Sequence, residues 1–203
     1  MTNGPLLRKM IAEGRISDPA SSRGRLLAAA ARLFREKGYS RTTVRDLAAD
    51  VGILSGSIFH HFKNKDEILF GVMNEVVISM EEALKAALDE AQTTRDKVRA
   101  LILNELGFIH GKTGDASSVL VYEWRALSKE RQIQVMTGRE VYFRLWRETI
   151  EKAQEEGMTV VESEYLSQLL HGAIVWTAHW YQPGGELSMD QLADRIMTLA
   201  IKD

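Results

Sequence analysis

The amino-acid sequence predicts an all-α protein in which an N-terminal three-helix domain precedes a larger helical domain. Three observations carry this prediction. Apolar residues recur at intervals of three and four positions through most of the 203 residues, which is the period of an amphipathic helix. Only 3 prolines interrupt a chain rich in alanine, leucine, glutamate and arginine, all good helix formers. No segment shows the apolar–polar alternation of a β-strand.

The first part of the chain contains an arm and one helix. Residues 1–21 carry glycine, proline and serine together with basic side chains, so we expect a flexible basic arm with a short helix at 6–11. A helical apolar pattern follows over 23–37, with Ser22 as its N-cap. Gly38 then ends this helix, because glycine readily adopts the left-handed conformation found after helix ends.

Two short helices follow, over 44–51 and 55–61, with Gly52 in the joint between them. Thr43 and the acid three residues later, Asp46, form a capping-box pattern at the start of the first. Two short helices so closely joined are typical of a helix-turn-helix. A tight corner between two helices of an ordinary all-α protein is the alternative interpretation.

Six longer helices make up the rest of the chain. Ser55 can cap the second short helix, Asn64 the first long helix, and Ser188 the last one. We therefore divide the chain into the arm, a helix-turn-helix domain at 22–67 and a second domain at 68–203. The expected long helices span 65–91, 95–110, 116–127, 130–155, 163–181 and 189–202.

Basic and acidic residues are unevenly distributed between these parts. Residues 1–65 contain 12 lysines and arginines against 5 aspartates and glutamates, a balance of +7. The chain totals of 26 and 28 leave 14 basic and 23 acidic residues after position 65, a balance of −9. A basic end on an acidic body is typical of a protein whose one end contacts a polyanion such as nucleic acid. An accidental imbalance of solvated faces is the alternative.

The sequence excludes or disfavours several kinds of chemistry. Because there is no cysteine, disulfide frameworks, cysteine-ligated metals and thiol nucleophiles are excluded. The glycines of 107–113 lack the spacing of a phosphate-binding loop, and no serine lies in a Gly-x-Ser-x-Gly motif. His60 and His61 diverge by about 100° on a helix, and His171 and His179 also diverge. We therefore expect no catalytic residue, metal or cofactor.

The composition is that of a folded chain, with 45% hydrophobic and 27% charged residues. No run of about 18 apolar residues is present to span a bilayer. The N-terminal segment also lacks the apolar core of a secretory signal. We expect a cytoplasmic protein without a membrane partner.

Aromatic residues concentrate in the second domain, which contains eleven of the fifteen, including all four tryptophans. An ordinary aromatic core explains most of them, but a cavity walled by such side chains also suits an apolar ligand. Nearby arginines can bind an anionic group, or else form ion pairs with Glu140, Glu148 or Glu151. The candidate ligand-binding residues are Tyr122, Arg125, Tyr142, Arg144, Trp146, Arg147, Trp176 and Trp180.

The last two helices are more apolar than surface helices. Gly172 and Ala173 within 166–180 permit a close helix crossing, and the final helix carries apolar residues from Met189 to Ala200. Two such helices from each of two chains can form a four-helix interface, which predicts a homodimer. Burial within one chain is the competing explanation.

The segments T-T-V-R-D-L-A at 42–48 and S-G-S-I-F-H-H-F-K-N-K-D-E-I-L from Ser55 resemble the N-terminal DNA-binding region of the TetR family of bacterial transcriptional regulators. The resemblance covers residues 22–70. It implies an all-helical homodimer in which three N-terminal helices bind a palindromic operator in double-stranded DNA. It also implies that a variable C-terminal domain binds a small-molecule effector.

This resemblance assigns expected DNA contacts to particular residues. Thr43 and Arg45 lie near phosphates, the short helix from Ser55 enters the major groove, and Lys65 with its helix N-terminus holds a phosphate. The residues expected to contact DNA are Arg41, Thr42, Thr43, Arg45, Ser55, Gly56, Ser57, Phe59, His60 and Lys65.

The chain departs from the family pattern at Leu54, where serine or threonine is usual, at Ser55, and at Phe59, where tyrosine is frequent. The pattern W-x3-W-Y-x-P-G-G from Trp176 to Gly185 resembles the branch that controls fatty-acid or steroid catabolism, whose effectors are acyl-CoA thioesters. We therefore expect a repressor of such a pathway, released by an acyl-CoA-like effector. A small helical enzyme acting on an apolar substrate, or a helical scaffold that binds only protein, is the alternative.

Overall fold

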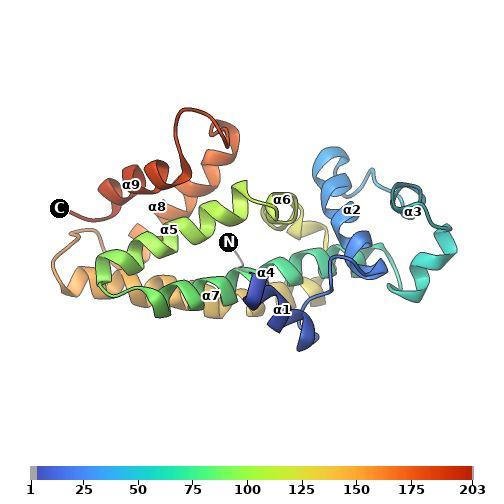
Figure 1. Cartoon of the computed structure of the whole chain (residues 1–203), viewed down its shortest axis with the longest axis horizontal. Coiled ribbons are helices and arrows are strands. Elements are labelled where there is room, and N and C mark those ends of the chain that lie inside the picture. Colours follow the sequence, from blue (N-terminus) through green and yellow to red (C-terminus); the bar gives the residue numbers. More distant parts are fainter. Residues whose placement is uncertain (1–3, 203) are drawn as a thin grey trace. The chain divides into compact units, whose positions relative to one another are not determined.

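The computed structural model describes residues 4–202, and within this range it contains helices and connecting loops but no β-strand (Figure 1). The all-α prediction is therefore confirmed. The described helices, in chain order, are α1 (Gly4–Ala12), α2 (Ser22–Lys37), α3 (Val44–Val51), η1 (Ser55–His60), α4 (Lys65–Glu90), α5 (Thr94–His110), α6 (Gly114–Tyr122), η2 (Trp124–Ala126), α7 (Lys129–Glu155), α8 (Ser163–Trp176), η3 (Thr177–His179) and α9 (Met189–Ala200), where η marks a short 3-10 helix.

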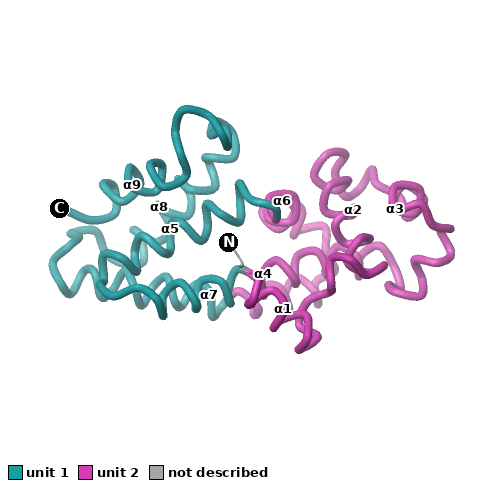
Figure 2. The backbone as a smooth tube through the Cα atoms, viewed as in Figure 1, with its two compact units in different colours: residues 1, 80–112, 140–203 teal, residues 2–79, 113–139 magenta. Residues whose placement is uncertain are grey.

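These helices form two compact units (Figure 2). Within the described residues, unit 1 comprises 80–112 and 140–202, and unit 2 comprises 4–79 and 113–139. Helices α4 and α7 therefore contribute their N-terminal parts to unit 2 and their C-terminal parts to unit 1. The division expected from the sequence, after residue 67, differs because 113–139 packs with the N-terminal helices.

In unit 2, α2 packs against both α3 and α6. Two polar contacts accompany this packing: Arg35 Nη1 lies 2.6 Å from Asp115 Oδ1, and the Tyr39 amide donates to Glu123 Oε1 at 3.2 Å. Such contacts explain why the segment that contains α6 belongs to this unit. The large side chains that are fully buried here include Leu26, Phe34, Leu47, Ile58, Phe62, Ile68 and Leu69.

In unit 1, α5 packs against α8 and α9 around a core centred on Trp146. Arg99 of α5 forms ion pairs with two aspartates of α9. Its Nε lies 2.7 Å from Asp194 Oδ1, and its Nη2 lies 2.9 Å from Asp190 Oδ1. The core side chains around Trp146 come from α4, α5, α7, α8 and α9. They include Leu84, Leu101, Ile102, Leu106, Ile150, Leu170, Ile174 and Ile196.

Most of the helix caps expected from the sequence are present. Asn64 Oδ1 accepts from the Glu67 amide at 2.8 Å, and Ser188 Oγ accepts from the Gln191 amide at 3.1 Å. The cap of α2 is an exception. The helix already includes Ser22, and the preceding Ser21 accepts from the Gly24 amide at 3.0 Å. The Ser22 prediction is therefore wrong by one residue.

Two expected helices end earlier than predicted. The helix expected over 116–127 stops at Tyr122 and continues only as η2, because the chain turns so that the Ser128 amide donates to Asp66 Oδ1 at 2.9 Å. The helix expected over 163–181 tightens into η3 at Thr177. The Thr177 hydroxyl is buried and donates to the Ile174 carbonyl at 2.6 Å, a side-chain bond that competes with regular helical hydrogen bonding.

The N-terminal segment, expected to be a flexible arm with a short helix, packs on the protein over much of its described length. α1 spans Gly4–Ala12, and Met10 and Ile16 are buried. At Gly24 the arm lies so close that an added Cβ would stand 2.1 Å from the carbonyl oxygen of Asp18. The apolar side chains at positions 10 and 16 explain this packing, because burying them is favourable.

Candidate nucleic-acid interface and effector site

Helix α3 and η1 are joined by a tight turn in unit 2. Thr43 Oγ1 accepts from the Asp46 amide at 3.1 Å, and Asp46 Oδ2 accepts from the Thr43 amide at 2.7 Å, so the predicted capping box is confirmed. Hydrogen bonds from the Thr43 hydroxyl and amide lower the pKa of the Asp46 carboxyl. Gly52 ends α3 with a φ of 75°, a left-handed conformation that glycine adopts without strain. The predicted pair of short helices with a glycine joint is thus present.

The second helix of this pair is a 3-10 helix over Ser55–His60 and not the predicted α-helix through His61. Its N-cap residue is Leu54 rather than Ser55, and it makes no side-chain capping hydrogen bond. The segment has no side-chain cap, and Gly56 in its first turn has a low helix propensity. Both properties disfavour an α-helix here.

This 3-10 helix is anchored on one side and open on the other. Ile58 is fully buried in unit 2, whereas Leu54 and Phe59 are exposed over 81% and 57% of their surface. The segment therefore presents a mixed surface of small polar, aromatic and imidazole groups. Of the expected DNA contacts on it, Gly56, Phe59 and His60 are exposed and Ser55 and Ser57 are half-buried.

Thr42 and Lys65, both expected to contact DNA, make contacts within the protein. Thr42 is fully buried, and its hydroxyl donates to the carbonyls of Leu33 at 3.2 Å and Gly38 at 2.9 Å. We therefore correct the direct contact expected of Thr42 to a positioning role. Lys65 Nζ donates to the carbonyls of Tyr39 and Thr42, at 2.9 Å each. Two of its three N–H groups are thus occupied.

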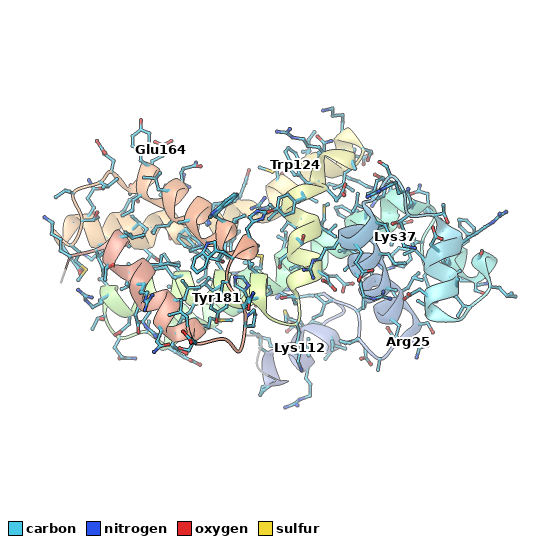
Figure 3. All side chains as sticks on the ribbon, turned by 90° about the horizontal axis from the view of Figure 1, so that it is seen from above. Arg25, Lys37, Lys112, Trp124, Glu164 and Tyr181 are labelled. Atoms are coloured by element: carbon cyan, nitrogen blue, oxygen red, sulfur yellow. The ribbon has the colours of Figure 1, made fainter. Side chains whose placement is uncertain are left out.

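The remaining basic candidates lie at the surface of unit 2. Arg41 and Arg45 are exposed, although Arg41 Nε also donates to the Lys37 carbonyl at 2.6 Å. Figure 3 labels Arg25 and Lys37, two further exposed cations toward opposite ends of α2. The excess of positive charge in this part of the sequence is therefore carried by exposed side chains as well as by the half-buried Lys65.

Comparison with family models gives two matches. The C-terminal domain model of tetracyclin repressor-like proteins matches residues 91–203, which is more than half of the chain. The model of bacterial regulatory proteins of the tetR family matches residues 26–72, which include α3 and η1. The chain belongs to the TetR family. The resemblance found on the helix-turn-helix residues is therefore confirmed.

Three relatives show how this TetR-family protein compares over its whole length. The HTH-type transcriptional repressor KstR2 of Rhodococcus jostii (strain RHA1) is 30% identical over 194 residues, which cover 91% of this chain and 92% of KstR2. The solved structure of the superantigen pfit is 44% identical, with a TM-score of 0.85 and coverage of 98% and 100%. AibR, solved with isovaleryl coenzyme A and operator DNA, is 21% identical, with a TM-score of 0.81 and coverage of 89% and 98%. AibR thus shares the fold.

The candidate ligand-binding residues of this TetR-family protein divide by burial. Tyr142 and Trp146 of α7 lie in the core of unit 1. The other candidates are exposed. Arg144 Nε lies 3.8 Å from Glu148 Oε1, which is one of the ion pairs named above as the alternative to ligand binding. The structure therefore does not bring the arginines of α7 together with its buried aromatic residues. The exposed candidates are Tyr122, Arg125, Arg144, Arg147, Trp176 and Trp180.

The sequence predicts no site role for two polar residues that lie near Tyr142 and Trp146. Glu105 of α5 is buried, and its Oε2 lies 2.7 Å from His171 Nδ1 on α8. A single acidic residue within the apolar stretch 100–109 gives no signal of a site, since its partner lies 66 positions away. Within the described residues no group of three or more histidines, acids or cysteines is placed to hold a metal ion. No helix there is both long and apolar enough to cross a bilayer.

Proposed function

We propose that this TetR-family protein is a dimeric, DNA-binding transcriptional repressor that a small molecule releases from its operator. The observation that carries the proposal is the helix-turn-helix of α3 and η1, whose exposed residues lie in the segment of +7 charge. Membership of a family of bacterial regulatory proteins and the similarity to KstR2 support it over a helical enzyme. We expect the protein to act in the cytoplasm.

Selection of bound fragments from the source genome, followed by affinity measurements on one of them, tests the DNA-binding part. Affinity should fall linearly with salt on a log–log scale, with a slope of about 0.9 per phosphate neutralised. Arg45→Ala should weaken binding to all sequences alike, whereas Ser57→Ala should change which bases are preferred. Lys97→Ala, which removes an exposed cation of unit 1, is the matched control. DNA affinity that does not depend on salt would contradict the proposal.

An acyl-CoA thioester is the effector that the relatives support. A solved structure describes KstR2 of Mycobacterium tuberculosis as a ketosteroid transcriptional regulator, and AibR binds isovaleryl coenzyme A. In this chain, the buried aromatic residues of α7 suit an apolar acyl group. The exposed Arg144 and Arg147 lie three positions apart on the same helix and suit phosphates. We therefore infer a role in lipid or steroid catabolism.

Titration of the protein–operator complex with hexanoyl-CoA, free CoA and hexanoate tests this effector class. The thioester should release DNA at a far lower concentration than either fragment, because each fragment loses half of the contacts. Arg147→Ala should reduce sensitivity to the thioester while DNA affinity stays unchanged, and Arg195→Ala on the exposed face of α9 is the control. Equal release by hexanoate would remove CoA from the proposal.

The 44% identity to the superantigen pfit favours a second candidate function, that of a superantigen. Operator selection separates the two, because a superantigen has no need to read a DNA sequence. A helix-turn-helix with an exposed reading segment favours the regulator. Failure to enrich any genomic sequence would favour the superantigen role instead.

A further inference from the structure

A polar cluster lies inside unit 1, where apolar side chains surround it. Glu105 is 5% exposed, and its Oε2 contacts His171 Nδ1 at 2.7 Å. The Tyr142 hydroxyl donates to the same oxygen at 3.4 Å. Burial and the charge of Glu105 raise the pKa of Tyr142, so this side chain remains a neutral hydrogen-bond donor. Three helices, α5, α7 and α8, thus converge on one carboxylate.

Two nitrogen atoms at the edge of this cluster are left without a partner. Trp146 Nε1 and His171 Nε2 are both closed to solvent, and neither makes a hydrogen bond with any of the described residues. The two rings lie against each other, with centroids 4.1 Å apart. A buried polar group without a partner destabilises the fold, because it loses its hydrogen bonds to water and gains none in return. Two such groups side by side, from different helices, mark a place where a polar atom of a ligand would be stabilised.

The chemistry of the two nitrogens limits what can bind there. An indole N–H can only donate, so the ligand atom has to be an acceptor. His171 Nδ1 is already engaged by Glu105, which fixes the ring and leaves Nε2 to face the ligand. The nearby carboxylate repels an anion, and this disfavours phosphate and carboxylate groups. Because the ring donates its Nδ1–H to the Glu105 carboxylate, Nε2 can only accept. A neutral hydroxyl group meets all three conditions, since its oxygen accepts from the indole N–H and its own proton is donated to His171 Nε2.

We propose that Trp146 and His171 bind a neutral hydroxyl group in the buried part of the effector, with Trp146 Nε1 as the donor to it and His171 Nε2 as the acceptor from it. Glu105 is the positioning residue that holds His171 for this contact. The inference rests on the proposed effector-binding function and adds to it the chemical group that the buried end of the site recognises. Because both nitrogens are closed to solvent, the oxygen enters only when neighbouring side chains move, and the half-buried Phe143 is in ring contact with His171.

Direct binding to the full-length, DNA-free protein tests the proposal with four probes of one chain length. Hexanoyl-CoA carries only the thioester carbonyl, S-hexyl-CoA lacks it, 3-oxohexanoyl-CoA adds a ketone and 3-hydroxyhexanoyl-CoA adds a hydroxyl group. We expect a preference of about tenfold for 3-hydroxyhexanoyl-CoA, which is the size of one net hydrogen bond. Trp146→Phe should abolish that preference. Trp124→Phe, the same change in unit 2, should keep it.

A second readout separates this inference from the proposed function and does not depend on the variant folding. In 1H–15N spectra of the wild-type protein, each of the 4 tryptophans gives an indole N–H signal. Cyclohexanol should shift the Trp146 signal downfield, whereas methylcyclohexane should not. If no thioester releases operator DNA, the acyl-CoA proposal fails, and the indole signal still tests whether Trp146 and His171 form a binding site. Equal shifts from both probes, or unchanged selectivity in Trp146→Phe, would overturn it.

Discussion

Lys65 holds together the loop between α2 and α3 with a single side chain. Its ammonium group donates to the carbonyls of Tyr39 and Thr42 and lies 4.1 Å from the centroid of the Tyr39 ring. Each hydrogen bond to a charged donor contributes about 1.5–3 kcal/mol. Because the same residue begins α4, it fixes the entry of that helix against the loop. Stability and phosphate binding therefore compete as explanations of its role.

Replacing Lys65 with methionine distinguishes these roles. We expect the free energy of unfolding to fall by about 2–4 kcal/mol, because both carbonyls lose a charged donor. If the third N–H also binds a phosphate, the slope of log affinity against log salt falls by about 0.9. Denaturant unfolding and DNA titration at several salt concentrations measure the two effects. Lys63→Met, at an exposed neighbour, is the control, and an unchanged stability would contradict the anchoring role.

At the scale of single residues, the sequence predicts chemistry better than burial. Thr42 and Thr43 are adjacent and chemically identical, yet only Thr43 is exposed. The capping pattern identifies Thr43 because its partner, Asp46, is three positions away. The partners of Thr42 are carbonyl groups, which every residue has, so no sequence pattern can reveal them.

Among the secondary-structure elements, those fixed by local contacts are the ones that the sequence predicts well. The caps of α3 and α9 depend on side chains three positions apart. The end of α8 depends instead on Thr177, whose hydroxyl lies 2.6 Å from His110 Nε2, a residue 67 positions away. For the same reason the pattern of apolar residues predicts α8 but not its transition to η3.

The capping box of α3 predicts a pH dependence of stability. Because the folded state lowers the pKa of Asp46 below its ordinary value of 3.8, the carboxylate stabilises the fold above that pH. This stabilisation is lost as the pH falls through the lowered folded-state pKa. Asp46→Ala should therefore be less stable than the wild type at pH 7, and the difference should shrink steadily below pH 4.

Denaturant midpoints of the two proteins between pH 7 and pH 2 measure this difference. Asp89→Ala, at an exposed aspartate in the last turn of α4, provides the control because no cap depends on it. A gap between wild type and Asp46→Ala that stays constant over this pH range would show that the carboxylate charge does not act through the cap.

In the whole molecule, the sequence does not reveal how segment 113–139 packs, but it does reveal the apolar stripe on α8. The packing of 113–139 with the N-terminal helices depends on contacts such as Arg35 to Asp115, 80 positions apart. The apolar stripe on α8 was visible in the sequence, and its residues are exposed in the single chain. These are Tyr165, Leu169, Gly172, Ala173, Trp176 and, just beyond the helix, Trp180. Such a stripe is typical of a face that a second chain covers.

Ala173→Arg tests whether this stripe forms the dimer interface. The substitution would bury an unpaired charge at the helix crossing, so we expect monomers where the wild type is dimeric at micromolar concentration. Asp89→Arg introduces the same side chain at the exposed end of α4 and should leave the dimer intact. Sedimentation velocity measures both, and a dimeric Ala173→Arg protein would place the interface elsewhere.

A dimer that carries one reading segment per chain also fixes the geometry of its operator. With η1 of each chain in the major groove, the half-sites should form an inverted repeat with centres about 34–36 Å apart or a multiple of that distance.

Inserting five base pairs between the half-sites turns one of them to the opposite side of the duplex, because a helical turn takes about 10–10.5 base pairs. Only one chain can then bind specifically, and affinity should fall toward the non-specific level, by about a thousandfold or more. An insertion of the same length outside the repeat is the control and should change nothing. Electrophoretic mobility shifts with the three duplexes measure the effect, and equal affinity for all three would mean that the two chains bind their half-sites independently.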